Sequence, residues 1–287
     1  MRIAAVQMDV RLNDVPHNVG RISEFLRQTA RAGAKLAIFP ECATTGYCFT
    51  SLEEGRAVAE PIPGPTTEAL AAVCRETGSW CVFGMLEASG TDVFNVAVLV
   101  GPQGVTGAYR KVHLPWLGID MFTTPGDRPF AVQDVDGLRL GMNICYDSGF
   151  PEASRCLALG GADLIALPTN WPPGAECMAA HAVPTRAMEN AVYFAAVNRV
   201  GAERGFKFIG HSSICAPNGD VLAAASASEE EILYADVDPA RARNKRIVRV
   251  PSKHVIDRMA DRRPEMYQAV VESHALSRPR DDAGRPG

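Results

Sequence analysis

The chain lacks the long apolar runs and the excess of positive charge that mark membrane-spanning and nucleic-acid-binding proteins. No apolar stretch approaches the ~20 residues that a transmembrane helix needs. Lysine and arginine number 29 against 33 aspartates and glutamates, a formal net charge of −4. Such a balance argues against nucleic acid or an anionic membrane surface as a partner. Met1 is followed by a charged residue and a predicted strand, not by a secretory leader. We therefore expect a cytoplasmic protein with no membrane or nucleic-acid partner.

Paired cysteines and clustered metal ligands are also missing. The eight cysteines include no CxxC pair, and His113, His181 and His211 do not have the spacing of a zinc set. A chain of 287 residues, 47% of them hydrophobic, can bury an ample core without disulfides. Most cysteines are therefore expected to be small buried residues in a reducing cytosol. The sequence predicts neither a metal nor an organic cofactor.

Three reactive residue types are present, each at the end of a predicted strand. Glu41 follows the strand-like run 35–39, Lys111 ends a strand in AYRKVHLP, and Cys145 follows the apolar run 138–144. A helical stretch opens at Pro151, soon after Cys145. A thiol between a strand and a helix can be presented as a nucleophile, with backbone N–H groups pointing at the group it attacks.

These residue types together predict hydrolysis through a covalent thioester. A thiol needs a base, and a partly desolvated carboxylate such as that of Glu41 has a raised pKa suited to that role. An ammonium at Lys111 can stabilise the thiolate and then the oxyanion, with the backbone N–H of Tyr146 as a second donor.

Two of these residues have an alternative, Cys42 for Cys145 and Arg110 for Lys111. Cys42 also follows a strand and neighbours Glu41, but no helix start comes close behind it. Strand alternation places Arg110 and Lys111 on opposite faces, so one of the two is expected to point inward.

Two segments of the chain follow one plan. AGAKLAIFPECATTGY (32–47) and GGADLIALPTNWPPG (160–174) share a Gly-Ala turn, an apolar strand and a proline at its end, and each follows an amphipathic helix. Further strands precede those helices, and predicted hairpins follow, one of them marked by Asn218-Gly219. Each half is then a sheet covered on one face by helices. Packing the two sheets together gives an α/β fold, a four-layer αββα sandwich with internal pseudo-two-fold symmetry.

The predicted domain organisation is simple. We expect a single domain over 1–270 and a flexible tail over 271–287, which carries no chemistry. Residues 173–190 are expected to form a helical stretch that Pro184 interrupts.

The motifs FPE, RKxHLP and NICYDxxFPE, in that order, resemble those of the nitrilase superfamily of carbon–nitrogen hydrolases. The likeness runs from Arg2 to about Tyr267. It implies the αββα architecture and selects Lys111 over Arg110. It also implies that subunits pair through helices after the catalytic cysteine. With the helical segment 175–190 and the basic stretch 241–263, this predicts a homodimer or a larger even-numbered homo-oligomer.

The chain departs from the family pattern at two places. Many relatives have a second glutamate between the lysine and the cysteine, whereas no glutamate lies between Lys111 and Cys145 here. Asp120 is the nearest carboxylate and is expected to orient Lys111, unless it is a solvated loop residue. Relatives that bind a substrate carboxylate often have an arginine beyond the cysteine, where this chain has Ser148-Gly149. Tyr146-Asp147 stands where nitrilases usually have Trp-Glu.

These differences favour a small amide or N-carbamoyl (ureido) substrate with a neutral or basic remainder. Trp116, Asn170 and Trp171 are expected on loops at the same end as the three reactive residues, either as pocket walls or as core. Nitrile hydrolysis and acyl transfer to an amine are alternatives on the same residues. A catalytically silent binding protein of the same fold is an alternative of another class.

Overall fold

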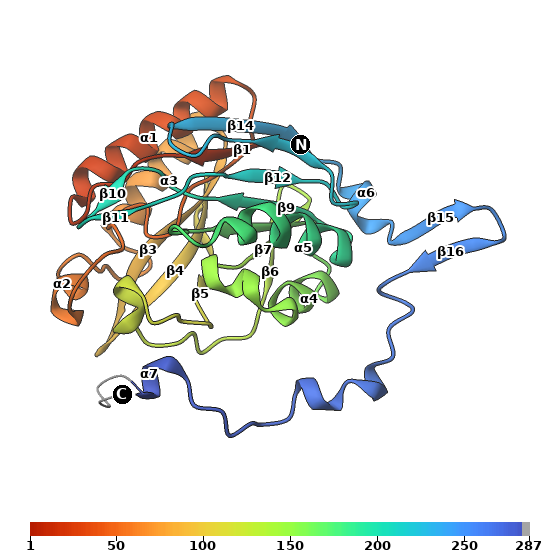
Figure 1. Ribbon diagram of the computed structural model, residues 1–287. Helices are drawn as coiled ribbons and strands as arrows, with labels where there is room; N and C mark the ends of the chain where they lie inside the picture. The colour runs from red at the N-terminus through yellow and green to blue at the C-terminus, as the bar shows by residue number, and fades with distance from the viewer. Residues whose placement is uncertain (283–287) are drawn as a thin grey trace.

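A computed structural model describes residues 1–282 and contains two six-stranded sheets with helices on their outer faces (Figure 1). Helices α1 (Val15–Arg31) and α3 (Pro65–Thr77) cover the first sheet, and α4 (Pro151–Leu159) and α5 (Val183–Asn190) cover the second. The predicted αββα arrangement is confirmed. Among the described residues, no helix combines the length and apolar character that a bilayer crossing requires.

The first sheet combines strands from both ends of the chain. Its strands, in spatial order, are β14 (Glu231–Asp236), β1 (Arg2–Gln7), β2 (Leu36–Ile38), β3 (Trp80–Ser89), β4 (Asp92–Gly101) and β5 (Gly104–Arg110). β1, β2 and β3 are parallel, and β14 and β4 run against them. β5 is antiparallel to β4 and so runs in the direction of β2. The short helix α2 (Leu52–Ala57) lies between β2 and α3.

Read from β6 to β13, the second sheet repeats this series of strand directions. Its strands, in spatial order, are β13 (Val221–Ala224), β12 (Ser213–Cys215), β9 (Tyr193–Val197), β8 (Leu164–Pro168), β7 (Leu138–Met142) and β6 (Val132–Val135). Again three parallel strands lie between an antiparallel edge strand and a hairpin. The predicted β-α units and hairpins are present in both halves. The pseudo-two-fold axis itself stays a prediction.

The side chains of β1 pack into two different core layers. Ile3 and Ala5 belong to the core between the sheets, whereas Ala4 and Val6 belong to the core under α1 and α3. Successive side chains of a strand point to opposite faces, so a strand covered on both faces is apolar at nearly every position. α1 contributes a single apolar face, on which Ile22 and other residues at helical spacing are buried.

The region around Pro184 differs from the prediction. The π-helical segment Met178–Ala182 leads directly into α5, and Pro184 lies in the first turn of α5. The backbone is helical from residue 176 to residue 190, so a turn of helix already precedes Pro184. Proline cannot donate the hydrogen bond of a regular helical turn, and the π-helical distortion at Met178–Ala182 lies where that bond is missing. The helical path therefore continues through Pro184 instead of being interrupted by it.

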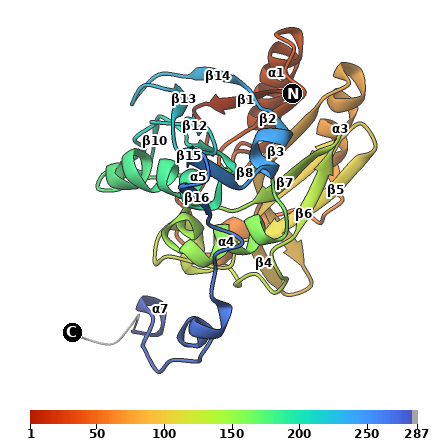
Figure 2. The same cartoon turned by 90° about the vertical axis from the view of Figure 1, so that its right-hand side faces the viewer.

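The C-terminal part of the described chain extends beyond the two layers. After α6 (Pro239–Arg243), the hairpin of β15 (Arg246–Val250) and β16 (His254–Asp257) projects from the body in Figure 1 and lies in front of it in Figure 2. The chain then follows the outside through two 3-10 turns (Pro264–Met266 and Gln268–Val270) to α7 (Pro279–Asp282). A small antiparallel pair, β10 (Ala202–Glu203) and β11 (Phe206–Lys207), lies elsewhere on the surface.

Part of the predicted flexible tail makes a defined contact. In α7, Arg280 Nη2 donates to the backbone carbonyl of Asp120 at 2.8 Å. The predicted tail continues to residue 287, and its residues 283–287 lie outside the described part of the chain.

Candidate active site

Glu41, Lys111 and Cys145 all lie just past the carboxyl ends of strands. Glu41 follows β2 and Lys111 follows β5 in the first sheet, while Cys145 follows β7 in the second. β2 and β5 run in the same direction, so their ends share one edge of the sheet. The three residues retain 1%, 1% and 7% exposure, respectively. Two charged groups are thus buried beside each other, which requires close pairing.

The ammonium of Lys111 is held between two carboxylates. Its Nζ donates to Glu41 Oε1 at 2.7 Å and to Asp120 Oδ2 at 2.5 Å, and all three side chains are fully buried. Asp120 lies in the 3-10 turn Gly118–Met121. The predicted contact between Asp120 and Lys111 is present, and the interpretation of Asp120 as a solvated loop residue is wrong.

Two further residues that the sequence did not single out complete this network. Asn95 Nδ2 donates to Glu41 Oε1 at 2.7 Å and to Asp120 Oδ1 at 2.9 Å. The hydroxyl of Tyr47 donates to Asp120 Oδ2 at 2.8 Å. Asn95 lies within the apolar strand β4 (VFNVAVLV), and a lone amide in such a run is a signal of a buried polar contact. Tyr47 has no comparable signal, since it lies in a loop.

One oxygen of Glu41 remains available. Oε2 is buried and has no hydrogen-bond partner among the described residues, whereas Oε1 accepts from Lys111 and Asn95. The backbone of Glu41 is held by Asn170, whose Nδ2 donates to its carbonyl at 2.9 Å. Gly84 lets this loop approach β3, because a Cβ there would lie 2.2 Å from the nitrogen of Cys42. The unpaired oxygen is the atom able to exchange a proton with the thiol or substrate.

The pKa shifts agree with a neutral thiol and a nearby base. Burial raises the pKa of Glu41, and the Lys111 ammonium opposes this shift without cancelling it. Burial alone would lower the pKa of Lys111, but the charges of Asp120 and Glu41 outweigh it and hold that pKa well above its usual range. Burial and the charge of Glu41 raise the pKa of Cys145 to about 12, opposed by Lys111. The thiol is therefore protonated at rest, and its nucleophilic form requires proton transfer.

Cys145 sits in a strained turn between β7 and α4. Its φ is +45°, and it begins the 3-10 turn Cys145–Gly149. A non-glycine residue in this region costs about 1–3 kcal/mol and persists only where its surroundings enforce it. The hydroxyl of Ser148 donates to the Cys145 carbonyl at 2.7 Å, which contributes to that enforcement. The N–H of Tyr146 is among the first of this turn, so by position it has no acceptor within the turn.

Cys42 shares the positive φ of Cys145 but not its setting. Its φ is +47°, its side chain is fully buried, and its Sγ lies 3.6 Å from Asn95 Oδ1. Burial, together with the charges of Glu41 and Asp120, raises the pKa of its thiol well above the usual value. These features fit a structural thiol that helps to hold Asn95.

Arg110 and Lys111 point to opposite faces as strand alternation predicts, yet both are buried. Arg110 Nη2 donates to Glu87 Oε1 at 2.7 Å, and its guanidinium lies 3.8 Å from the ring centre of Phe94. The expectation that one of the pair would point inward was thus incomplete. On the face opposite to Lys111, the buried Arg110 is neutralised by its ion pair with Glu87.

The predicted pocket walls fall into different environments. Trp171 is buried in the hydrophobic core cluster that contains strands of both sheets, in line with the core interpretation. Trp116 is 46% exposed on the loop after β5, and the side chain of Tyr146 is 44% exposed, edge-on to the ring of Phe150. Asn170 is buried and bound to the Glu41 backbone, with its Oδ1 unpaired among the described residues.

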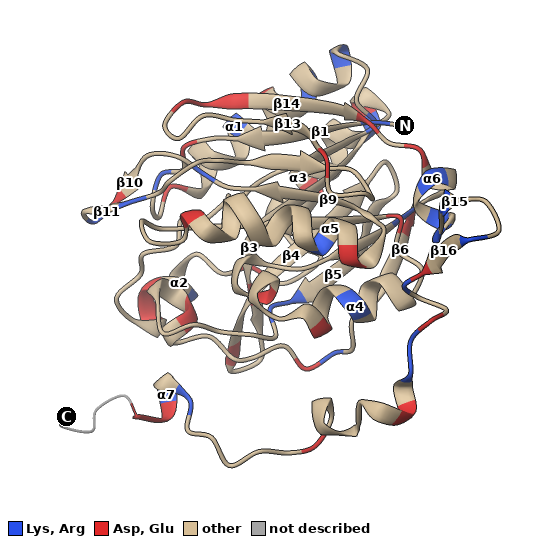
Figure 3. Cartoon of the chain, turned by 45° about the vertical axis from the view of Figure 1, so that its right-hand side comes forward, with Lys and Arg blue, Asp and Glu red and all other residues tan. Residues whose placement is uncertain are grey.

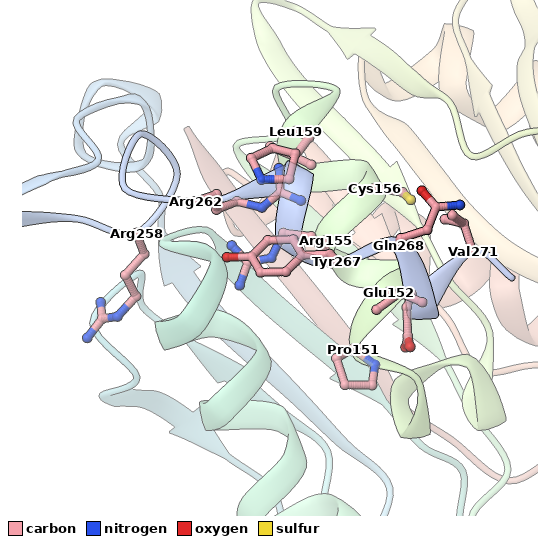
Figure 4. Close-up of a pocket in the computed structure, with 12 residues that line it drawn as sticks. Pro151, Glu152, Arg155, Cys156, Leu159, Arg258, Arg262, Tyr267, Gln268 and Val271 are labelled. Carbon is pink, nitrogen blue, oxygen red and sulfur yellow. The ribbon is translucent and has the colours of Figure 1, made fainter.

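A cavity of about 670 Å³ lies elsewhere, between α4 and the C-terminal segment (Figure 4). Arg155, Cys156, Leu159, Arg262 and Tyr267 are among its lining residues. None of the three strand-end residues lines it. This cavity is therefore separate from the candidate active site.

Comparison with known protein families shows which family the chain belongs to. The family model described as carbon–nitrogen hydrolase matches residues 2–247. The chain belongs to this family. This carbon–nitrogen hydrolase is therefore an enzyme that acts on C–N bonds other than peptide bonds, and the resemblance noted in the sequence is confirmed. A catalytically silent binding protein is not supported.

Individual relatives of this carbon–nitrogen hydrolase carry amidase and nitrilase names. A protein of Pyrococcus abyssi named nitrilase is 41% identical over 93% of this chain and 99% of its own length. The omega-amidase of Homo sapiens is 32% identical over 83% of this chain and 88% of its own. The structure of an amidase from Nesterenkonia sp. matches with a TM-score of 0.79 and 27% identity, covering 94% of this chain and 96% of that one. In a glutamate-to-glutamine mutant of the Nesterenkonia amidase, acrylamide has added to the active-site cysteine.

Proposed function

We propose that this hydrolase cleaves the C–N bond of a small amide or N-carbamoyl compound through a thioester on Cys145. The observation that carries the proposal is the buried pairing of Lys111 with Glu41, whose second carboxylate oxygen is left unpaired. The relatives named amidases and the covalent adduct on the cysteine of the Nesterenkonia enzyme support it.

Each step has a group to carry it. Glu41 takes the thiol proton of Cys145 as the sulfur bonds to the carbonyl carbon, and the carbonyl oxygen becomes an oxyanion. Lys111 Nζ and the N–H of Tyr146 stabilise that oxyanion. Glu41 then protonates the leaving nitrogen, the C–N bond breaks, and ammonia or an amine departs. Water attacks the thioester with Glu41 as base, and the acid leaves as the thiol is restored.

The substrate class is tested by a panel of compounds assayed for ammonia. We expect turnover of small neutral amides or ureides above that of dicarboxylate half-amides, because Ser148-Gly149 offers no arginine for a second carboxylate. Hydroxylamine, added as an acceptor, separates acyl transfer from hydrolysis, and nitriles in the same panel test nitrile hydrolysis. Ammonia release from nitriles but from no amide or ureide would overturn the proposal.

Asp120 is proposed to hold Lys111 charged and in place. Asp120→Asn is expected to slow thioester formation about ten- to a hundredfold, by analogy with outer-shell residues at metal sites, because it weakens a charge-assisted hydrogen bond to Lys111. Single-turnover acylation measures the effect. The matched control is Asp127→Asn, which changes an exposed partner of Arg110. An unchanged acylation rate in folded Asp120→Asn would show that other groups position Lys111.

We propose that the enzyme works as a homodimer or a larger even-numbered assembly. The projecting β15–β16 hairpin carries exposed Val248 and Val250, and the segment beyond it exposes Val270, Val271 and Leu276. Exposed apolar side chains in this number, on segments outside the two layers, are typical of a protein interface. Figure 3 shows lysine and arginine positions in blue on α6 and β15.

Light scattering at micromolar concentration is expected to give at least twice the monomer mass. Val248→Lys with Val250→Lys should shift this mass toward the monomer, because two charges would be buried without partners. Thr91→Lys, which adds a charge in the exposed turn between β3 and β4 that Arg56 of α2 contacts, serves as the control. A wild-type mass equal to one chain contradicts the proposal.

We further propose that the enzyme resides in the cytoplasm. All eight cysteines are free in the structure, including Cys74 and Cys81, whose sulfurs lie 3.8 Å apart. Free thiols at that separation are typical of a reducing compartment.

A further inference from the structure

Asp147 accepts hydrogen bonds from two separate parts of the chain. It is fully buried, two residues beyond Cys145. Its Oδ2 accepts from the N–H of Ile144 at 2.8 Å and from the hydroxyl of Tyr109 at 2.8 Å. Its Oδ1 lies 3.2 Å from the backbone nitrogen of His113 and 2.7 Å from His113 Nδ1. An ionised carboxylate only accepts, so all these partners serve as donors.

The partners of Asp147 flank both reacting side chains. Ile144 directly precedes Cys145, and Tyr109 and His113 stand two residues before and two residues after Lys111. Tyr109 lies one residue before the end of β5 in the first sheet, while the Cys145 turn follows β7 in the second. The carboxylate thus bridges the two sheets where each delivers one reacting group.

The surroundings make this bridge rigid. The backbone N–H of Asp147 donates to the Ile144 carbonyl at 2.9 Å, so both backbone groups of Ile144 are bound by one residue. The ring of His113 stacks on that of Phe150, with centroids 3.7 Å apart and an angle of 8° between planes. Phe150 directly precedes α4, so the stack also fixes the far end of the Cys145 turn.

We propose that Asp147 is a positioning residue that sets the Cys145 thiol in register with the Lys111 ammonium across the two sheets. This inference rests on the roles proposed above for Lys111 and Cys145. Asp147 itself exchanges no proton with the substrate. It acts by enforcing the positive φ of Cys145 and the direction in which Lys111 leaves β5.

The decisive variant is Asp147→Asn, with Asp163→Asn as its matched control. An asparagine must turn an NH₂ group toward at least one of the donors, which breaks part of the bridge while it keeps the volume. Asp163 is also a buried aspartate of the second sheet, bound by Arg139 N at 2.9 Å and Arg243 Nη2 at 2.7 Å. It precedes β8, at the sheet edge opposite to Cys145. Both variants remove a buried structural carboxylate, but only that of Asp147 lies between the segments that carry Lys111 and Cys145.

The measurements separate positioning from stability. For Asp147→Asn we expect kcat to fall about ten- to a hundredfold, with KM within about threefold, and Cys145 to react several-fold more slowly with iodoacetamide. Asp163→Asn should lower the melting temperature but keep kcat and the alkylation rate. Wild-type kcat and alkylation in folded Asp147→Asn would overturn the proposal, and so would equal losses of both in the two variants.

Tyr109→Phe keeps the proposal testable if Asp147→Asn does not fold. It removes the hydrogen bond to Asp147 and the longer one that the hydroxyl accepts from the N–H of Val112 at 3.4 Å. We expect it to lower kcat about three- to tenfold at constant KM. An unchanged kcat and alkylation rate would overturn the proposal. Alkylation of Cys145 needs no substrate, so the alkylation rates of the variants can be compared even if the enzyme turns over none of the amides in the panel. A lack of turnover by the wild-type enzyme would count against the proposed function, but not against the positioning role of Asp147.

Discussion

Cys145→Ala is expected to lower amide turnover at least about 10⁴-fold, while the melting temperature changes little. The sulfur forms the bond to the acyl group in the proposed mechanism, and no other group in the site can replace it. Its buried position in the 3-10 turn accepts a methyl group without a new clash, since alanine is smaller than cysteine. Ammonia release by the purified variant, beside a thermal unfolding curve, measures both quantities.

The control for this loss is Cys156→Ser, which changes an exposed thiol on α4 and should leave the rate unchanged. Retention of more than a few per cent of activity by folded Cys145→Ala would place the nucleophile elsewhere. Cys42 would then be the first alternative, and Cys42→Ala in that background would test it. The Cys42 sulfur contacts Asn95 and is fully buried, so we expect Cys42 to support no turnover in Cys145→Ala.

Glu41→Gln is expected to lose activity about as completely as Cys145→Ala. One carboxylate serves as base toward the thiol, as acid toward the leaving nitrogen and as base toward water, and an amide can do none of these. The glutamine keeps the volume and can still accept from Lys111, so the fold should survive. Glu87→Gln is the matched control, because it changes a buried glutamate of the same sheet that pairs with Arg110. Accumulation of a stable thioester, seen by mass spectrometry, would restrict Glu41 to the second half of the reaction.

The wild-type pH profile is a further measurement of the same group. Glu41 must be ionised to accept the thiol proton, and burial raises its pKa above the usual 4.5. Activity is therefore expected to fall as the pH drops, with the midpoint of kcat/KM above pH 4.5. A midpoint at or below that value would show that another group controls the acid side of the profile.

The sequence predicts best those features that depend on neighbours along the chain. Strand alternation and turn residues locate Glu41, Lys111 and Cys145 at strand ends, because a strand and its end are local properties. Asn95 joins the site through contacts with Glu41 and Asp120, and Tyr47 joins it through its contact with Asp120; in each case the partner lies far along the chain. Such pairs depend on strand order and sheet packing, and local periodicity contains no information about either.

The same limit applies to features that the sequence predicts incompletely. It offers Asp120 as a partner of Lys111 or as a solvated loop residue, and the first is observed, because a turn rich in glycine does not reveal what covers it. Pro184 predicts an interrupted helix, but the π-helical segment Met178–Ala182 accommodates it, and the sequence carries no signal for that distortion. The bridging role of Asp147 could not be anticipated, since Tyr109 and His113 come from the opposite sheet.

The pairing of β14 with β1 has a consequence for how the chain is made. Six residue pairs join the two strands, from Arg2 with Asp236 to Gln7 with Glu231. During synthesis, β1 leaves the ribosome first and keeps one open edge until almost the whole sandwich has been translated. An open apolar edge recruits other strands, and contacts between distant segments form slowly. We therefore expect nascent chains that end before β14 to need chaperones, and N-terminal fragments expressed alone to aggregate.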